Sequence, residues 1–321
     1  MKKMLFLSLL LSGNVMAATH IEWPPATPNP PVNDIPLPAV AKKLTYAQLR
    51  EKIATATFDG IAPDPGAITA WEADFKARYS LGKTKICKYS RTTLINWLDN
   101  KSGVVDSPNF DNCDLSRLNL SKKQINNASI NNTKIDFAKV GVFRNAHGFG
   151  ASFYMSNLDG ADFYGLKARM VLFQSSSLNR TRLNKADIRG AYIVDSVGKA
   201  SFAGSIMVNS IISKSVLIEK NCHINQPKLS FCPGSSFQLA SITGLLVDNA
   251  QLTNLDWMSA RTKNVLIVNS NVSAMYPSNA ISAKNFRIRE SFRNYLVYAN
   301  GHPYKMEQQE IGWDGDAYWN F

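Results

Sequence analysis

The sequence predicts a mainly β protein, built as a β-solenoid in which short coils stack through a parallel sheet. Apolar residues recur every five positions over the central half of the chain, roughly from Cys113 to Met275, and the residue two places before each apolar centre is usually small. Neither an amphipathic helix nor an alternating strand produces a five-residue period. Helical spacing before Cys113 adds a small α-helical cap to the predicted fold.

Residues 1–17 have the composition of a secretory signal peptide. Lys2 and Lys3 precede a short apolar run, and cleavage is expected after Ala17. That run is too short to span the ~30 Å hydrocarbon core of a bilayer. We therefore expect a periplasmic, outer-membrane-associated or secreted protein with no transmembrane segment of its own.

Residues 18–41 form a proline-rich segment. Proline excludes helix and inner strand, so this segment is predicted to be an extended arm. A spacer is the favoured interpretation. The alternative is an arm that docks on a partner, for which Trp23 is the candidate contact.

Residues 42–110 carry helical signals and are predicted to cap the first coil of the solenoid. Thr45 can cap a helix that continues through Ile53, and two further helices are expected over 67–79 and 92–98.

The repeat itself is assigned to residues 111–280. Its phase slips near Val140, near Gly198 and between Cys222 and Gly234, and loops are expected to protrude there. The apolar centres between these slips include Phe153, Leu158, Phe163, Phe173, Leu178, Leu183, Ile188, Ile193, Phe202, Met207, Phe237, Ile242, Val247, Leu252 and Trp257.

The units 156–160, 161–165 and 186–190 read Ser-Asn-Leu-Asp-Gly, Ala-Asp-Phe-Tyr-Gly and Ala-Asp-Ile-Arg-Gly. They resemble the pentapeptide-repeat family, and the resemblance covers about half of the chain. It implies a right-handed quadrilateral β-helix with one unit on each side and about twenty residues in each coil. The small and central residues would point inward, into an interior without room for polar groups.

A twenty-residue coil predicts which side chains stack. Inside the solenoid, Phe153, Phe173 and Ile193 should lie above one another, as should Phe237 and Trp257. Outside, Asp162 should lie beside Arg182, Lys167 beside Asp187, and Arg169 beside Arg189, which is a like-charge pair.

Residues 281–321 are predicted to form a C-terminal cap and an aromatic tail. Trp313, Trp319 and Phe321 make this tail too apolar to be left in water. Burial on the chain itself is the favoured interpretation, and strand addition to a partner is the alternative.

The four cysteines of the mature chain favour disulfides in an exported protein. The expected pairs are Cys222 with Cys232, across a break in the repeat, and Cys87 with Cys113, at the first coil. Sequence alone allows three connectivities. Metal binding is the rival interpretation, without CxxC or HxxxH spacing to support it.

No catalytic, cofactor or metal motif is evident, so the chain is predicted not to be an enzyme. Phosphate-binding loops and GxSxG elbows are missing from the sequence. His147 and His223 lie at phase slips and are interpreted as ordinary loop residues, with catalysis on these loops as a minor alternative.

The formal net charge of +12 favours an anionic partner. Arg169, Arg189, Lys185 and Arg180 are the candidate binding residues of a basic face, and a plain solvated face is the alternative. Because the chain is expected to be exported, nucleic acid is not an expected partner.

Together these features predict a non-enzymatic structural or interaction protein of the Gram-negative envelope. A subunit of a multiprotein assembly, such as a secretion-system core or an outer-membrane-associated complex, fits the rigid repeat between two terminal arms. The alternative is a secreted binding module or effector that recognises lipopolysaccharide, peptidoglycan or a host ligand through the basic face.

Overall fold

A computed structural model of the 321-residue chain describes residues 42–56, 65–78, 86–217, 234–253, 255–273, 282–289, 292–294 and 317–319. These residues belong to one compact unit, Leu37–Phe321. The predicted signal peptide and proline-rich arm, with Trp23, lie outside them, as do Trp313, Phe321, His223 and the predicted Cys222–Cys232 pair.

Three helices precede the repeat: α1 (Tyr46–Thr55), α2 (Pro65–Arg78) and α3 (Arg91–Leu98). Each lies within two residues of its predicted position. Thr45 and Gln48 form a reciprocal capping box at the start of α1, which satisfies two backbone N–H groups that the first turn leaves unpaired. The Ser90 side chain accepts from the Thr93 N–H and caps α3 in the same way.

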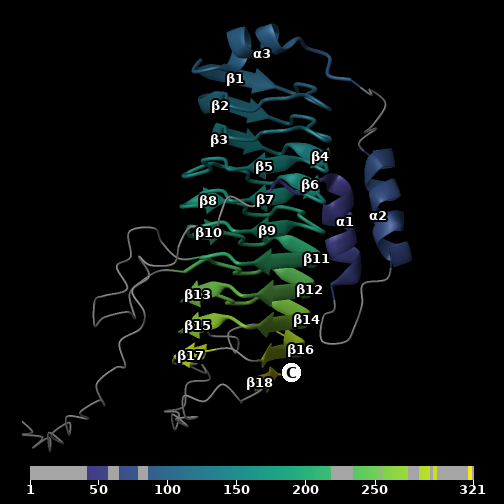
Figure 1. Cartoon of the computed structure of the whole chain (residues 1–321), viewed down its shortest axis with the longest axis vertical. Coiled ribbons are helices and arrows are strands. Elements are labelled where there is room, and N and C mark those ends of the chain that lie inside the picture. The colour runs from purple at the N-terminus through teal and green to yellow at the C-terminus, as the bar shows by residue number, and fades with distance from the viewer. Residues whose placement is uncertain are drawn as a thin grey trace, which may run out of the picture. The chain divides into compact units, whose positions relative to one another are not determined.

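Short strands make up the rest of the described chain, and all pair in parallel except the last (Figure 1). They are β1 (Gly103–Asp106), β2 (Asn119–Asn126), β3 (Lys139–Arg144), β4 (His147–Phe149), β5 (Ser152–Tyr154), β6 (Lys167–Arg169), β7 (Leu172–Gln174), β8 (Thr181–Arg182), β9 (Tyr192–Val194), β10 (Ala200–Ser201), β11 (Ile206–Ser213), β12 (Ser241–Asp248), β13 (Gln251–Thr253), β14 (Arg261–Val268), β15 (Asn271–Ser273), β16 (Ser282–Arg289), β17 (Phe292–Asn294) and β18 (Ala317–Trp319).

The strand register confirms the predicted coil of about twenty residues. Phe153 pairs with Phe173 and Phe173 with Ile193, and the two phenyl rings stack with centroids 5.0 Å apart. The rings of Phe237 and Trp257 also stack, at 4.8 Å. One continuous apolar core therefore runs along the axis of the solenoid.

The interior is not purely apolar, which corrects the expectation that it holds no polar groups. Ser156, Ser176, Ser196 and Ser215 form a buried column in which the N–H of each of the first three donates to the hydroxyl oxygen of the serine on the next coil. Each hydroxyl in turn donates to a backbone carbonyl. Serine is tolerated at the small position because both of its polar groups are satisfied.

The corners between the sides are set by the backbone. From Asn145 to Asp195 every fifth residue has a φ between +50° and +70°, the left-handed region that turns the chain. Glycine fills only some of these positions, and others hold Met155, Met170 or Arg180. A side chain in this conformation costs roughly 1–2 kcal/mol.

The three helices do not form a single cap, which differs from the expectation for residues 42–110. Leu94 and Leu98 of α3 join the axial core at the first coils. By contrast, α1 and α2 lie along the side of the solenoid (Figure 1). Leu49 and Ile53 of α1 and Phe75 of α2 pack there against apolar side chains that point out of the sheet, namely Phe149, Met170, Leu172, Tyr192, Val194 and Ile211.

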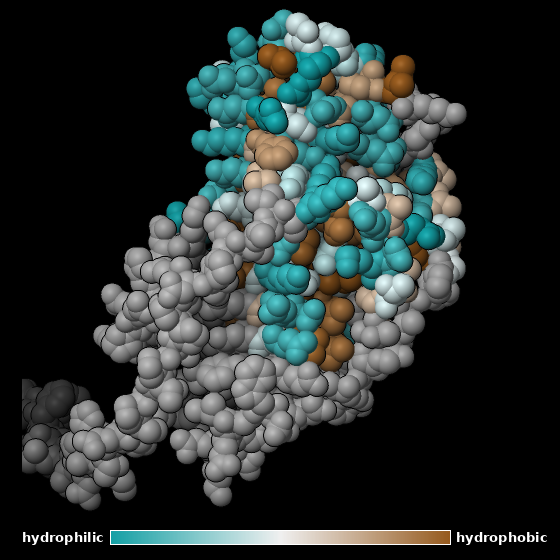
Figure 2. All heavy atoms as spheres, viewed as in Figure 1, coloured by the Kyte–Doolittle hydropathy of each residue, from teal (hydrophilic) through white to brown (hydrophobic). Residues whose placement is uncertain are grey.

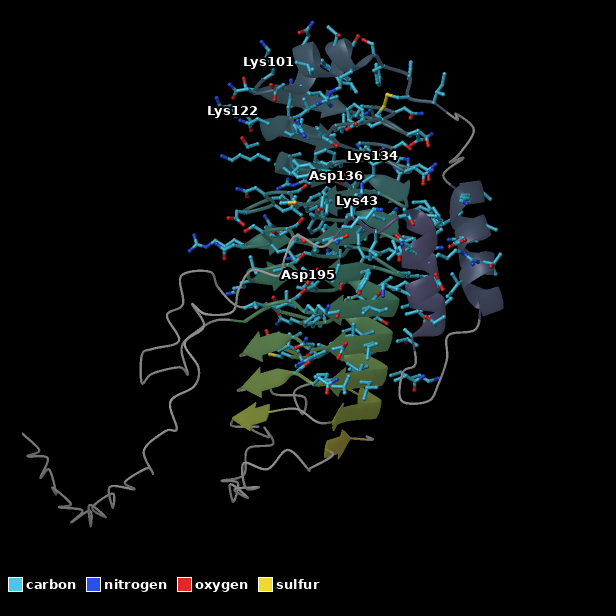
Figure 3. The ribbon with its side chains drawn as sticks, in the orientation of Figure 1. Lys43, Lys101, Lys122, Lys134, Asp136 and Asp195 are labelled. Carbon is cyan, nitrogen blue, oxygen red and sulfur yellow. A yellow bond between two sulfur atoms is a disulfide. The ribbon has the colours of Figure 1, made fainter. Side chains whose placement is uncertain are left out.

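Polar contacts hold residues 42–44, the segment before α1, against the solenoid. The Lys43 ammonium pairs with the buried Asp136 carboxylate and donates to the Ser152 hydroxyl (Figure 3). Gln174 accepts from the Leu44 N–H at 2.9 Å and donates to the Lys42 carbonyl. The Tyr46 hydroxyl donates to Glu72 of α2, and burial together with that carboxylate raises the pKa of Tyr46.

The departures from an even coil length in residues 103–273 fall at one corner. Leu120 pairs with Val140 but Ile125 with Phe143, so that coil is short. Ser177 pairs with Val197 but Thr181 with Ala200, a second shortening. At Val140 and Gly198 the expected protruding loops are therefore tightened corners. The third slip, 218–233, begins and ends at the same corner, and its path lies outside the described residues.

The last described strand turns back on the stack. β18 pairs antiparallel with β16, with Trp319 opposite Phe286 and Ala317 opposite Ile288. The backbone of this part of the aromatic tail thus pairs with its own chain, and burial of the aromatic side chains stays a prediction. At the other end, Cys87 and Cys113 form the expected disulfide and join the segment before α3 to the solenoid.

Candidate functional site

The four predicted binding residues do not form one basic face. The Arg169 side chain is 5% exposed and lies beneath α2, which the sequence analysis did not foresee. Its guanidinium lies 3.3 Å from Asp187, 4.0 Å from Asp74 and 4.6 Å from the centroid of the Phe75 ring. Burial lowers the pKa of Arg169, and Asp187 opposes that effect. Arg169 therefore holds α2 to the solenoid and is not a surface residue.

Arg189 joins the same cluster. It follows Arg169 by one coil, and its Nε lies 3.1 Å from the second oxygen of Asp187. Asp187 thus lies between two arginines and removes the repulsion that the stacked like charges would cause. Lys185 lies at another corner, exposed, with its ammonium 5.4 Å from the centroid of the Tyr164 ring.

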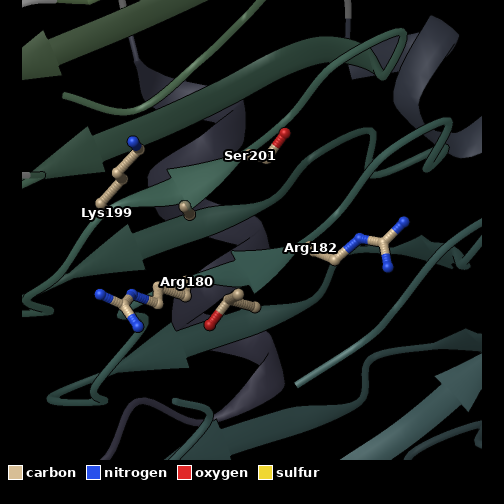
Figure 4. A pocket seen from close by; sticks show the side chains of 6 residues that line it. Arg180, Arg182, Lys199 and Ser201 are labelled. Atoms are coloured by element: carbon tan, nitrogen blue, oxygen red, sulfur yellow. The ribbon is translucent and has the colours of Figure 1, made fainter. Parts of the chain in front are cut away.

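Arg180 belongs to a second group of cations, which the sequence analysis did not assemble. It borders a hollow of about 170 Å³ together with Thr181, Arg182, Lys199, Ala200 and Ser201 (Figure 4). These residues come from two adjacent coils at the second tightened corner. We call Arg180, Arg182 and Lys199 the basic corner.

Gly198 is what allows the corner to tighten. Its φ is +115°, and a Cβ at this position would lie 2.5 Å from the Asn179 nitrogen. The backbones of the two coils are correspondingly close, with the Arg180 N–H donating to the Lys199 carbonyl at 2.6 Å. A larger residue cannot take this place, so the corner depends on glycine.

Acidic charge near the basic corner is limited and shared. Asp162 lies beside Arg182 at 3.5 Å, as predicted from the stacking, but it also accepts from Arg144 at 2.7 Å. Both arginine side chains are about half exposed. Across the described ranges, no carboxylate lies within ion-pair distance of Lys199. The corner therefore brings cations from two coils together, with Arg182 about half exposed and Lys199 partly exposed.

Two features of the backbone decide the type of solenoid: the twenty-residue register and the left-handed residue at each five-residue corner. This is the pentapeptide-repeat fold. Solved structures with some similarity include QnrB1, a plasmid-mediated fluoroquinolone resistance protein, at 14% identity over 52% of this chain and 84% of that one, with a TM-score of 0.31. HetL, a protein involved in heterocyst differentiation regulation in Nostoc sp. strain PCC 7120, gives 13% identity over 70% and 91%, with a TM-score of 0.26.

Rfr23, a pentapeptide-repeat protein from Cyanothece 51142, gives 11% identity over 62% of this chain and 97% of that one, with a TM-score of 0.15. The family models and the curated proteins gave no match. The register and the corners of this chain therefore identify the pentapeptide-repeat fold.

His147 lies in strand β4 of the pentapeptide-repeat solenoid and not on a slipped loop, which corrects the sequence interpretation. Its neighbours on the adjacent coils are Ser129 and Lys167. Burial lowers the pKa of His147, against the raising effect of Asp111. The side chain is thus one member of an outer ladder.

Apolar residues that point outward indicate which side of the solenoid the helices cover, and this pattern was not used in the prediction. Leu172, Tyr192 and Ile211 occupy the position before the apolar centre on successive coils, and α1 and α2 cover them. An apolar residue at that position about every twenty residues would have predicted a covered side. On the face shown in Figure 2, most of the described residues are hydrophilic, with apolar patches at the top and in the lower half.

Within the described part of the chain, no group of His, Cys, Asp and Glu is arranged to hold a metal ion. A helix long and apolar enough to cross a membrane is likewise not found among those residues.

Proposed function

We propose that this pentapeptide-repeat chain is a non-enzymatic interaction protein of the Gram-negative envelope, and a subunit of a multiprotein assembly such as a secretion-system core or an outer-membrane-associated complex. The solenoid serves as a rigid support, because its axis is filled with side chains and leaves the outer surface for partners.

Two features support an exported location. The amino-terminal sequence has the composition of a signal peptide. The Cys87–Cys113 disulfide is of a kind that persists in oxidising compartments and is rare in the cytosol.

The observation that carries the proposal is the exposure of Leu239. This leucine is 62% exposed and has a φ of +58°, so it bears the strain of the left-handed region without gaining burial. Met258, 45% exposed, lies on the next coil, where its carbonyl accepts from the Leu239 N–H. An exposed apolar pair at a strained position is accounted for if a partner protein covers it.

Crosslinking in intact cells tests the proposal. The full-length chain should be recovered in crosslinked complexes, and Leu239→Gly should reduce their yield strongly. The same substitution relieves the left-handed strain, so the purified Leu239→Gly variant should melt at a higher temperature than the natural protein. Loss of the complex together with a gain in stability separates binding from folding.

Lys214→Gly is the matched control, because Lys214 is exposed and has a φ of +48° at a different corner but is not apolar. It should leave the crosslinked complexes unchanged. The proposal fails if the natural protein runs only as a free monomer after crosslinking, or if Leu239→Gly keeps the full yield of complexes.

A further inference from the structure

We propose that the basic corner is a binding site for a phosphate group. This goes beyond the interaction role above and does not depend on it, since Leu239 and Met258 lie on other coils. Three properties of the corner favour a phosphate: its position in the solenoid, its charge and the size of its hollow.

The position of the corner separates it from the rest of the solenoid. The coil-length departures described above, at Val140, Gly198 and 218–233, meet at this one corner, while the other corners of residues 103–273 keep their five-residue spacing. At the second tightened corner, side chains of two adjacent coils surround the hollow. In a repeat protein, insertions in single repeats map to one face, which is often the binding face.

The charge of the hollow selects an anion. Arg180 and Arg182 flank Thr181 on one coil, and Lys199 comes from the next (Figure 4). The side chains of Arg180 and Lys199 lie on one side of the opening and that of Arg182 on the other. If these long side chains rotate toward the opening, their guanidinium and ammonium groups can donate to a ligand from both sides. Arginine forks match the paired oxygens of phosphate.

The size of the hollow selects a small group. A volume of about 170 Å³ is below the roughly 300–1,000 Å³ of sites that enclose a drug-sized molecule. It suits the tetrahedral head of a phosphate ester, with the remainder of the molecule outside. Ser201, partly exposed at the rim, adds a hydroxyl donor. The Thr181 hydroxyl is already engaged, since it donates to the Leu158 carbonyl.

The test measures binding of the purified mature chain to three probes: inorganic phosphate, glucose 6-phosphate, and phosphatidylcholine vesicles with or without phosphatidic acid. Arg180→Gln and Lys199→Gln should each weaken binding of the responding probe by about tenfold, the effect of one charge-assisted contact. A response to glucose 6-phosphate would identify a soluble ester as the ligand. A response to phosphatidic acid alone would identify a lipid headgroup.

Lys185→Gln is the matched control, because it removes the same charge from an exposed side chain at a neighbouring corner. It should change the affinity less than twofold. Equal losses in all three variants would show attraction by net charge only and would overturn the site, as would a lack of binding to every probe. Melting curves of the variants should coincide with that of the natural protein, since these side chains are not part of the core.

Discussion

The guanidinium of Arg169 lies over the ring of Phe75, with its Cζ 4.6 Å from the ring centroid. This contact joins β6 of the solenoid to α2, two elements about ninety residues apart in the sequence. The arginine is nearly inaccessible to water, and its guanidinium lies within ion-pair distance of Asp187 and Asp74. A charge that would otherwise be costly to bury thereby fixes the helix in place.

Arg169→Gln should destabilise the protein by about 3 kcal/mol, because it removes one partner of a buried ion pair and the cation–π contact together. The free energy of unfolding from urea titration measures the loss. Lys167→Gln, on the exposed side of the same strand, should cost less than about 0.5 kcal/mol. Equal costs for the two substitutions would show that the contact with α2 contributes little.

Gly198→Ala should be among the most damaging substitutions at a corner. The new methyl group would meet the Asn179 nitrogen at 2.5 Å in a conformation that alanine rarely adopts. We expect a loss of more than about 3 kcal/mol. Gly160→Ala has a positive φ and no atom within 4 Å of the added methyl, so only backbone strain of roughly 1 kcal/mol should remain. Comparing the thermal unfolding of the two variants separates the cost of the steric clash at Gly198 from the cost of backbone strain alone.

Asp195→Asn should stabilise the protein at neutral pH. Burial raises the pKa of Asp195, with a smaller opposing effect of Lys214, so the folded state favours the protonated carboxyl (Figure 3). The unfolded chain then loses its proton at a lower pH than the folded one. Stability from this residue is present at low pH and is lost as the pH rises through the folded pKa.

Melting temperatures of the Asp195→Asn variant and the natural protein should therefore diverge as the pH is raised from acid to neutral. Asparagine also suits the left-handed backbone of this position. A stability difference that is the same at every pH would show that the backbone, and not the charge, is responsible.

Replacement of Cys87 and Cys113 together by serine should lower the free energy of unfolding by about 3 kcal/mol, because the disulfide closes a 26-residue separation in the unfolded chain. Reduction should destabilise the natural protein by about 3 kcal/mol more than it destabilises the double variant, which keeps the expected Cys222–Cys232 pair. A natural protein whose stability is unchanged on reduction would contradict this prediction.

The sequence was sufficient for the inward apolar positions of the repeat. The five-residue period identified the axial core and the stacking of Phe153 on Phe173, because each inward side chain must fill the same space on every coil. Local caps such as Thr45 fixed the helix limits, since they depend only on neighbours in the chain.

The sequence did not reveal what joins distant elements. In the sequence, Arg169 occupies an outward position of the repeat like the other basic residues. Only the position of α2 in the structure shows that its side chain is buried. The hollow beside Lys199 was missed for a similar reason. In the sequence, a phase slip looks the same whether the chain forms a protruding loop or a tightened corner. Which of the two forms here depends on the backbone conformation of Gly198.

The position of α1 and α2 along the solenoid also has a mechanical consequence. Their apolar faces rest on strands β7, β9 and β11, so three coils that would otherwise touch only their neighbours share a common brace. Under a pulling force, the coils beyond this brace, from β13 onward, should unravel one at a time. The braced coils should unfold together at a higher force. The solenoid would then have one stiff part, beside α1 and α2, and one part that extends in steps.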